Sequence, residues 1–250
     1  MEPYRIVAER VTMYTAQVPK VANMEGAWLH RLSSISAIVF GLSYLVIIVL
    51  YVPVGAPPSE QLARLQYHGG NSNLWWAILS LSVFTDLLLI PIALSLFELL
   101  KSLNRQAMLL AVACIALFVF LDLAATWTNY ASIIVLSSLY SSTTSVGEQA
   151  RIVAAATAPT IMLNSTILFV YNTLTLSVGI LITGLVMLKG MFGKATAYLG
   201  IATGVLGILA VVGPIVVSAL SAVIIVASLL TMIWVLLVGV DLYRLTRSRP

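Results

Sequence analysis

The chain has 250 residues, of which 60% are hydrophobic and only 9% are charged, with a formal net charge of +4. About a quarter of the residues in soluble domains are charged, so this composition excludes a water-soluble fold of this size. Runs of about 20 apolar residues are typical of membrane-spanning helices. The basic residues lie beside such runs, where anionic lipid headgroups attract them. We therefore expect an all-α, multi-pass protein embedded in a lipid bilayer, and no binding of nucleic acid.

The N-terminal third begins with a basic segment and one apolar run. Residues 1–32 are polar and basic, and residues 5–14 could lie as a short helix at the membrane surface. The first predicted span covers residues 33–54, too long for the apolar region of a cleaved signal peptide. A short helix is predicted at residues 59–68, because Pro57 and Pro58 block its extension upstream and Gly69 and Gly70 end it.

Three further apolar runs follow, at residues 73–100, 106–137 and 159–188. Lys101 and Arg105 mark the turn between the first two of these runs. The run at residues 106–137 is expected to leave the membrane and continue as helix, and Ser141–Ser145 is predicted to be a loop. An amphipathic helix at residues 147–156 is predicted to lead into the fourth span.

The last apolar region, residues 195–240, contains 46 residues without a formal charge. As one helix it would be about 69 Å long at 1.5 Å per residue, twice a hydrocarbon core of about 30 Å. It must therefore fold back, and Gly213-Pro214 is the best position for the hairpin, since proline removes a backbone donor. This gives spans at residues 196–212 and 217–243, followed by a basic tail at residues 244–250.

The distribution of positive charge predicts the orientation. Eleven of the thirteen Lys and Arg residues lie in the N-terminal segment, the second and fourth connections, or the C-terminal tail. Arg64 and Arg151 are the two exceptions. Because short positively charged connections remain in the cytoplasm, we expect a six-helix transmembrane domain over residues 33–243, in the plasma or inner membrane, with both termini cytoplasmic.

Four acidic residues lie within or at the ends of the predicted spans. Glu98 and Asp241 are boundary charges, each three residues from a basic residue. Asp86 lies 11 residues past Trp75, about 16 Å along the helix. An Asp at the centre of a spanning helix costs about 2.5–3.5 kcal/mol on insertion scales, so we expect it to face the bundle interior, protonated or hydrogen-bonded.

Asp122 lies closer to the outer interface, and helical spacing places further polar residues near the two acids. The predicted ligand-binding residues are Asp86, Asp122, Ser82, Thr126, Asn129, Asn164, Tyr171 and Asn172. These side chains could form a polar pocket in the outer half of the membrane. The alternative is that they form interhelical hydrogen bonds that hold the bundle together, worth about 0.6 kcal/mol each.

Other residues point to packing rather than chemistry. Gly200, Gly204 and Gly207 give the fifth span a face that allows close approach of another helix, within this chain or in a second copy. With two His, one Cys and no metal-binding motif, the sequence predicts no catalytic residue, no metal site and no cofactor.

The chain resembles a broad prokaryotic family in three places. These are His30-Arg31 before the first span, Trp75 at the start of the second, and the sequence IWVLLVGVDLYR at residues 233–244. Over about residues 28–245 it resembles the uncharacterised six-helix integral membrane proteins of bacteria and archaea. The resemblance implies the six-helix fold. That family has no established activity, so the resemblance implies no substrate.

Three functional hypotheses remain open from the sequence. The first is small-molecule binding or transport through the polar pocket around Asp86 and Asp122. The second is a structural or accessory subunit that packs against another membrane protein, or against a second copy of itself, through its glycine-rich faces. The third, the least favoured, is a membrane enzyme acting on a lipid-like substrate, because no evident catalytic set is present.

Overall fold

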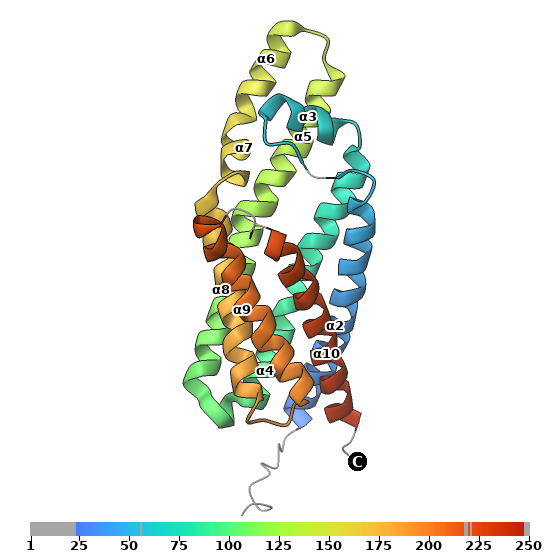
Figure 1. The fold of residues 1–250 in the computed structure, drawn as a ribbon. Coiled ribbons are helices and arrows are strands. Elements are labelled where there is room, and N and C mark those ends of the chain that lie inside the picture. Colours follow the sequence, from blue (N-terminus) through green and yellow to red (C-terminus); the bar gives the residue numbers. More distant parts are fainter. Residues whose placement is uncertain (1–23, 56, 218–219, 221, 248–250) are drawn as a thin grey trace, which may run out of the picture.

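The computed structural model describes residues 24–55, 57–217, 220 and 222–247, and it is helical throughout, with no strand in these ranges (Figure 1). The predicted helix at residues 5–14 lies outside the described residues. In chain order the elements are α2 (Met24–Tyr51), α3 (Gln61–Gly69), α4 (Ser72–Leu121), the π-helix η1 (Asp122–Trp127), α5 (Thr128–Ser142), α6 (Val146–Ala155), α7 (Thr157–Leu163), α8 (Thr166–Met187), α9 (Lys194–Val216) and α10 (Val223–Arg247).

Five helical stretches of the described chain are long and apolar enough to cross a bilayer. They are Trp28–Tyr51, Ser72–Ser142, Thr166–Met187, Lys194–Val216 and Val223–Arg247. These stretches fit a multi-pass membrane protein built as a helix bundle. Their apolar surfaces remain exposed along much of their length, as expected for helices that face lipid rather than water.

The second stretch has 71 residues and is not straight. The backbone leaves helical geometry at Asn104, with φ −159° and ψ 91°. There the chain reverses, so that α4 consists of a first limb, residues 72–103, and a second limb, residues 105–121, that runs back beside it (Figure 1). Hydrogen bonds join the reversed segments at Ser72–Ser138 and at Asp86–Trp127. The bend lies between Lys101 and Arg105, where the charges predict a turn.

The long helices form a ring. Each packs against two neighbours in the order α2, α4, α8, α9, α10 and back to α2. A continuous apolar core fills the half of this ring that includes Leu96, Met108, Ile180 and Val235. The core therefore closes one end of the bundle, and polar residues gather farther along the same helices.

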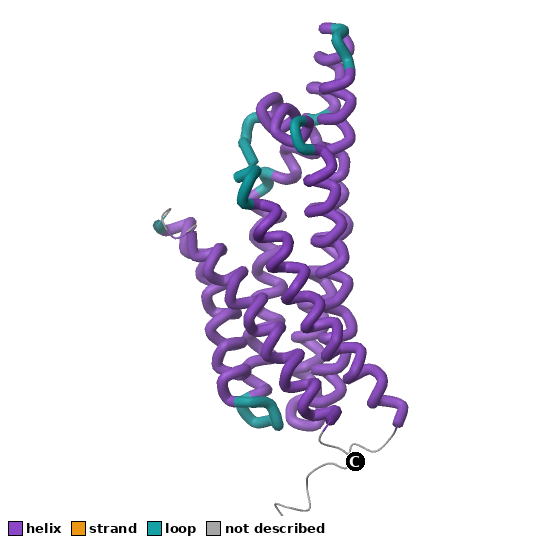
Figure 2. Tube along the Cα trace, turned by 90° about the vertical axis from the view of Figure 1, so that its right-hand side faces the viewer, coloured by secondary structure: helices purple, strands orange, loops and turns teal. Residues whose placement is uncertain are grey.

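The two ends of the molecule differ in charge. The start of α2, the bend at Asn104, the α8–α9 turn and the end of α10 lie together at one end, called here the basic end (Figures 1 and 2). Every described Lys or Arg belongs to this end except Arg64 and Arg151. The structure thus gathers in space the basic segments that alternate along the sequence.

An outer cap made of α3, α6, α7 and the end of α5 covers the opposite end (Figure 1). Helix α3 begins after Glu60, whose side chain accepts a hydrogen bond from the Ala63 backbone N–H, and it ends at Gly69. The side chain of Gln61 reaches α6 by donating to the Val153 carbonyl oxygen. Helices α3 and α6 match the short helices predicted at residues 59–68 and 147–156 to within two residues.

The structure differs from the predicted helices in two places. The helix does not turn at Gly213-Pro214, since α9 continues to Val216, and Val217 N–H bonds to the Gly213 carbonyl oxygen. Proline removes one backbone donor, a loss that membrane-spanning helices tolerate where neighbouring groups satisfy the freed carbonyl oxygen. The 23 residues of α9 span about 35 Å, enough for the hydrocarbon core. The predicted fourth span at residues 159–188 is instead interrupted between Leu163 and Thr166, which separates α7 from α8.

Candidate functional site

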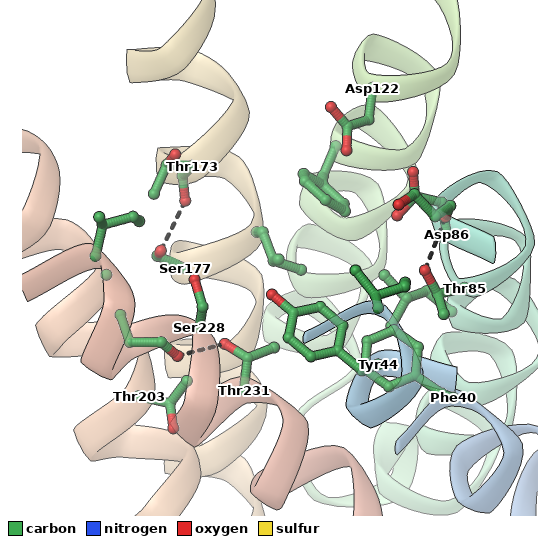
Figure 3. Close-up of a pocket in the computed structure, with 18 of the residues that line it drawn as sticks. Phe40, Tyr44, Thr85, Asp86, Asp122, Thr173, Ser177, Thr203, Ser228 and Thr231 are labelled. Carbon is green, nitrogen blue, oxygen red and sulfur yellow. Dashed lines mark hydrogen bonds between the residues drawn. The ribbon is translucent and has the colours of Figure 1, made fainter. Parts of the chain in front are cut away.

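A cavity of about 300 Å³ lies within the ring, between α2, both limbs of α4, η1, α8, α9 and α10. Figure 3 shows two polar walls that face each other across it. The acid wall comprises Ser82, Thr85, Asp86, Asp122 and Trp127; the hydroxyl wall comprises Thr173, Ser177, Thr203, Ser228 and Thr231. The volume lies at the lower end of the range for small-molecule sites.

The two acids of the acid wall are buried and lie next to each other. Asp86 is 6% exposed and Asp122 is 7% exposed. Trp127 donates its indole N–H to Asp86 Oδ2 at 2.6 Å, and Asn172 Nδ2 donates to Asp122 Oδ1 at 2.5 Å. Each carboxyl group is therefore held by a side chain that comes from a different segment of the chain.

The two carboxyl groups also lie close enough for their charges to interact. Two ionised carboxylates side by side in an apolar interior repel each other, and a proton on one of them removes this repulsion. The donors from Trp127 and Asn172 are neutral, and the one ion pair in the described residues joins Glu98 to Lys101 at the basic end. Within the described residues, no basic side chain is therefore paired with Asp86 or Asp122.

The π-helix η1 explains how Asp122 and Trp127 face the same cavity. In an α-helix, residues five apart differ in direction by about 140°. In a π-helix, i→i+5 hydrogen bonding brings them close to one face, and such turns are frequent at functional sites. The sequence prediction used α-helical spacing, which grouped Asp122 with Thr126 and Asn129. It therefore missed Trp127, for which the sequence suggested only a position near the interface.

The hydroxyl wall consists of Ser and Thr residues from α8, α9 and α10. The hydroxyls of Ser177 and Thr231 donate to carbonyl oxygens one turn earlier in their own helices, at 2.6 Å and 2.9 Å. Thr203 differs, because its buried hydroxyl oxygen has no hydrogen-bond partner in the described residues. Sequence reasoning did not identify this wall, since Ser and Thr bonded to their own helix are common in spanning segments.

Aromatic side chains line the space between the two walls. The rings of Phe40 and Tyr44 from α2 are stacked, with centroids 5.9 Å apart. Tyr44 lies between the acid wall and Ser228 of the hydroxyl wall (Figure 3). Phe118 and Trp127 add further rings from the second limb of α4 and from η1. A ligand in the cavity would therefore contact ring faces as well as polar groups.

The structure brings together part of the predicted residue set. Asp86, Asp122 and Ser82 line the cavity. Asn172 donates hydrogen bonds both to Asp122 and to Thr126 Oγ1, the latter at 3.4 Å. Thr126 and Asn172 therefore lie beside the acid pair. The three remaining residues lie elsewhere, as described next.

Asn129, Asn164 and Tyr171 do not line the cavity. Asn129 donates to the Ala125 carbonyl oxygen in its own helix, because the π-helix turns it away from Asp122. Asn164 lies in the outer cap, where it accepts a hydrogen bond from Arg64 at 2.6 Å. Tyr171 is 43% exposed on the surface of α8. The break between α7 and α8 shifts the helical phase on which the prediction of Asn164 and Tyr171 relied.

The three predicted packing glycines all face neighbouring helices of the same chain. A Cβ atom on Gly204 would lie 2.5 Å from Leu181 Cβ on α8, and one on Gly207 would lie 2.0 Å from Ser177 Oγ. A Cβ on Gly200 would lie 2.6 Å from Trp234 Nε1 on α10. The close approach therefore occurs within the chain, where it draws α9 against α8 and α10.

Comparisons with models of protein families, with curated proteins and with solved structures find no match to this chain. Within the described residues, no group of three or more His, Cys, Asp or Glu side chains could hold a metal ion. Function must therefore be argued from the geometry of the cavity itself.

Proposed function

We propose that this chain is an integral membrane protein with six transmembrane segments that binds or transports a small molecule through the cavity between Asp86 and the hydroxyl wall. In this proposal the two limbs of the stretch Ser72–Ser142 cross the membrane separately. The basic end faces the cytoplasm together with both termini, in agreement with the positive-inside rule. The membrane is then the plasma or inner membrane.

The observation that carries the functional part is the position of the acid pair beside an open cavity. Polar residues that only hold helices together are expected to pack directly against one another and leave no space. Here Asp86 and Asp122 meet each other and also line about 300 Å³ to which every long helix of the ring contributes. Ionisable residues at membrane depth that face a cavity mark ligand or proton pathways by default.

The accessory-subunit alternative receives less support. It relied on a glycine-rich face open to a partner, yet Gly200, Gly204 and Gly207 contact side chains of α10 and α8 in the same chain. A partner helix cannot use the same close approach without displacing α8 or α10. Binding within the cavity is therefore the function that the geometry supports best.

Cysteine accessibility tests this proposal. Cys114, the native cysteine, is replaced by Ser, and Ser228 on the hydroxyl wall is replaced by Cys in the purified protein. We expect Ser228→Cys to react with aminoethyl methanethiosulfonate, because a ligand cavity must admit small solutes.

The matched control is Ala111→Cys, which places a thiol in the fully packed core, where the native residue has no exposed surface. Reaction at Ser228→Cys should be at least about tenfold faster than at Ala111→Cys, since exchange into a packed core requires local opening. Equal, slow reaction at both positions would show a closed interior and would contradict the proposal.

A further inference from the structure

The charge of the cavity lining restricts the class of ligand. Two carboxyl groups line it, and no Lys, Arg or His is among its lining residues. Arg64, a buried basic residue of the outer cap, is occupied by Pro58 and Asn164. An anionic ligand would meet two acids without a counter-charge, at a high cost in an apolar interior. A cation would instead pair with a carboxylate as soon as one of the two acids loses its proton.

The shape and chemistry of the walls restrict the ligand further. Trp127 stands directly beside Asp86, and the stacked rings of Phe40 and Tyr44 lie next to the pair (Figure 3). Aromatic faces attract cations, most strongly where water is excluded. Rings also favour an apolar body over a hydrated metal ion. This combination fits an organic ammonium group attached to an apolar skeleton.

The hydroxyl wall offers a second anchor across the cavity from the acids. Thr203 is 2% exposed and lines the cavity. Its hydroxyl has no hydrogen-bond partner in the described residues. Buried polar groups are normally satisfied, so an unpartnered one that faces a cavity indicates a missing partner. Water or a polar group at the far end of the ligand can supply it.

We infer that the cavity binds a lipophilic organic monocation and that the Asp86–Asp122 pair exchanges a proton for it; this rests on the function proposed above. Without ligand, both carboxyl groups are protonated and the pair is neutral. When the monocation enters, one proton leaves to water. The remaining carboxylate balances the ligand charge while the second carboxyl group keeps its proton, so the buried site is neutral before and after exchange.

Three probes with the same apolar body and different charge test the inference. Phenylpropylamine is cationic, phenylpropanol neutral and phenylpropionate anionic at pH 7. Binding to the purified protein in detergent is measured by calorimetry. We expect the amine to bind at least about tenfold more tightly than the alcohol, because close buried charge pairs contribute more than 1.4 kcal/mol, and we expect no binding of the carboxylate. Titrations in two buffers of different ionisation enthalpy should show about one proton released per amine bound.

Variants assign the binding to the pair. The double variant Asp86→Asn/Asp122→Asn should lose the preference for the amine and the proton release. Glu98→Gln, the same chemical change in the same helix but at the exposed ion pair with Lys101, should retain both. Ser228→Phe, which fills the cavity without changing its charge, should block every probe.

The outcomes separate this inference from the proposed function. Equal affinity for amine and alcohol, both blocked by Ser228→Phe, would overturn the cation inference and leave the binding cavity in place. Amine binding that survives in the double Asn variant would also overturn it, as would the absence of amine binding to the unmodified protein. Amine binding without proton release would overturn the exchange. The proposed function itself is overturned only if Ser228→Cys reacts as slowly as Ala111→Cys in the accessibility experiment above.

Discussion

The acid pair and the outer cap both bury ionisable groups without an opposite charge beside them, yet they do so in different ways. In the cap, Arg64 is 5% exposed, and its guanidinium donates to the Pro58 carbonyl oxygen at 2.9 Å and to Asn164 Oδ1 at 2.6 Å. Both partners belong to the cap, and the third guanidinium nitrogen, Nη1, is buried without a hydrogen-bond partner in the described residues. In the bundle, Asp86 and Asp122 accept hydrogen bonds from the neutral donors Trp127 and Asn172, and both line the cavity.

This difference separates a structural charge from a functional one. The Arg64 side chain connects α3 to the chain before it and to the end of α7, so removing it leaves two acceptors without their donor. The acid pair links the helices only by accepting hydrogen bonds from Trp127 and Asn172. The oxygen of an amide side chain could accept the same bonds. Replacing Arg64 by a neutral side chain and replacing the acid pair by neutral side chains should therefore change the stability in opposite directions.

Replacing Arg64 by Met should produce the largest effect. Met keeps the length of the side chain but leaves the Pro58 and Asn164 oxygens without their donor, at a cost of about 2–4 kcal/mol for two such acceptors. The melting temperature of the detergent-purified protein should fall by roughly 5–15 °C. Arg151→Met on the exposed face of α6 is the control and should melt as the unmodified protein does. If the Arg64→Met variant were as stable as this control, Arg64 would be a functional charge rather than a structural one.

Replacing both acids should have a smaller effect of opposite sign. In Asp86→Asn/Asp122→Asn the amide oxygens can still accept from Trp127 and Asn172, while the need to protonate buried carboxyl groups disappears. Sites kept for function at the expense of stability typically return about 1 kcal/mol when they are neutralised, so the melting temperature should rise by roughly 2–4 °C. A clear fall in melting temperature would indicate that the pair is structural.

Much of the fold follows from local sequence signals. The apolar runs, the turn between Lys101 and Arg105 and the short helix bounded by Pro57-Pro58 and Gly69-Gly70 all depend on composition or on residues with special backbone geometry. These signals act over a few residues and require no knowledge of neighbouring helices. The depth of Asp86 below Trp75 follows in the same way, from the rise of a helix.

The composition of the cavity depends on features without a local signal. The π-helix at Asp122–Trp127 adds no distinctive residue, but it changes which side chains share a face, so Trp127 replaces Asn129 beside the acids. The break before Thr166 moves Asn164 into the cap. The position of Thr203 opposite the acids depends on how α9 packs against its neighbours through Gly204 and Gly207. Only the tertiary arrangement determines these positions.

His68 gives the smallest and most specific test of the cap. Its ring has no exposed surface, packs 4.5 Å from the Trp75 ring and donates from Nδ1 to the Arg64 carbonyl oxygen at 2.8 Å. Burial lowers the pKa of His68, and the nearby Arg64 charge lowers it further, against a raising effect of the backbone hydrogen bond. The folded protein therefore keeps this imidazole neutral, while the unfolded chain takes up a proton below a pKa of about 6.5.

The sign of the pH effect follows from this difference in proton uptake. The contribution of His68 to stability is fully present above pH 6.5 and declines as the pH falls, by at most about 0.8 kcal/mol at pH 6 for one proton. In His68→Phe the ring contacts remain and the titration is removed. The melting temperature of the unmodified protein should therefore fall by roughly 2–3 °C more than that of the variant between pH 8 and pH 6. If the two proteins had parallel pH profiles, His68 would be protonated in the folded cap. The cap would then hold two adjacent buried cations, His68 and Arg64, instead of the single charge on Arg64.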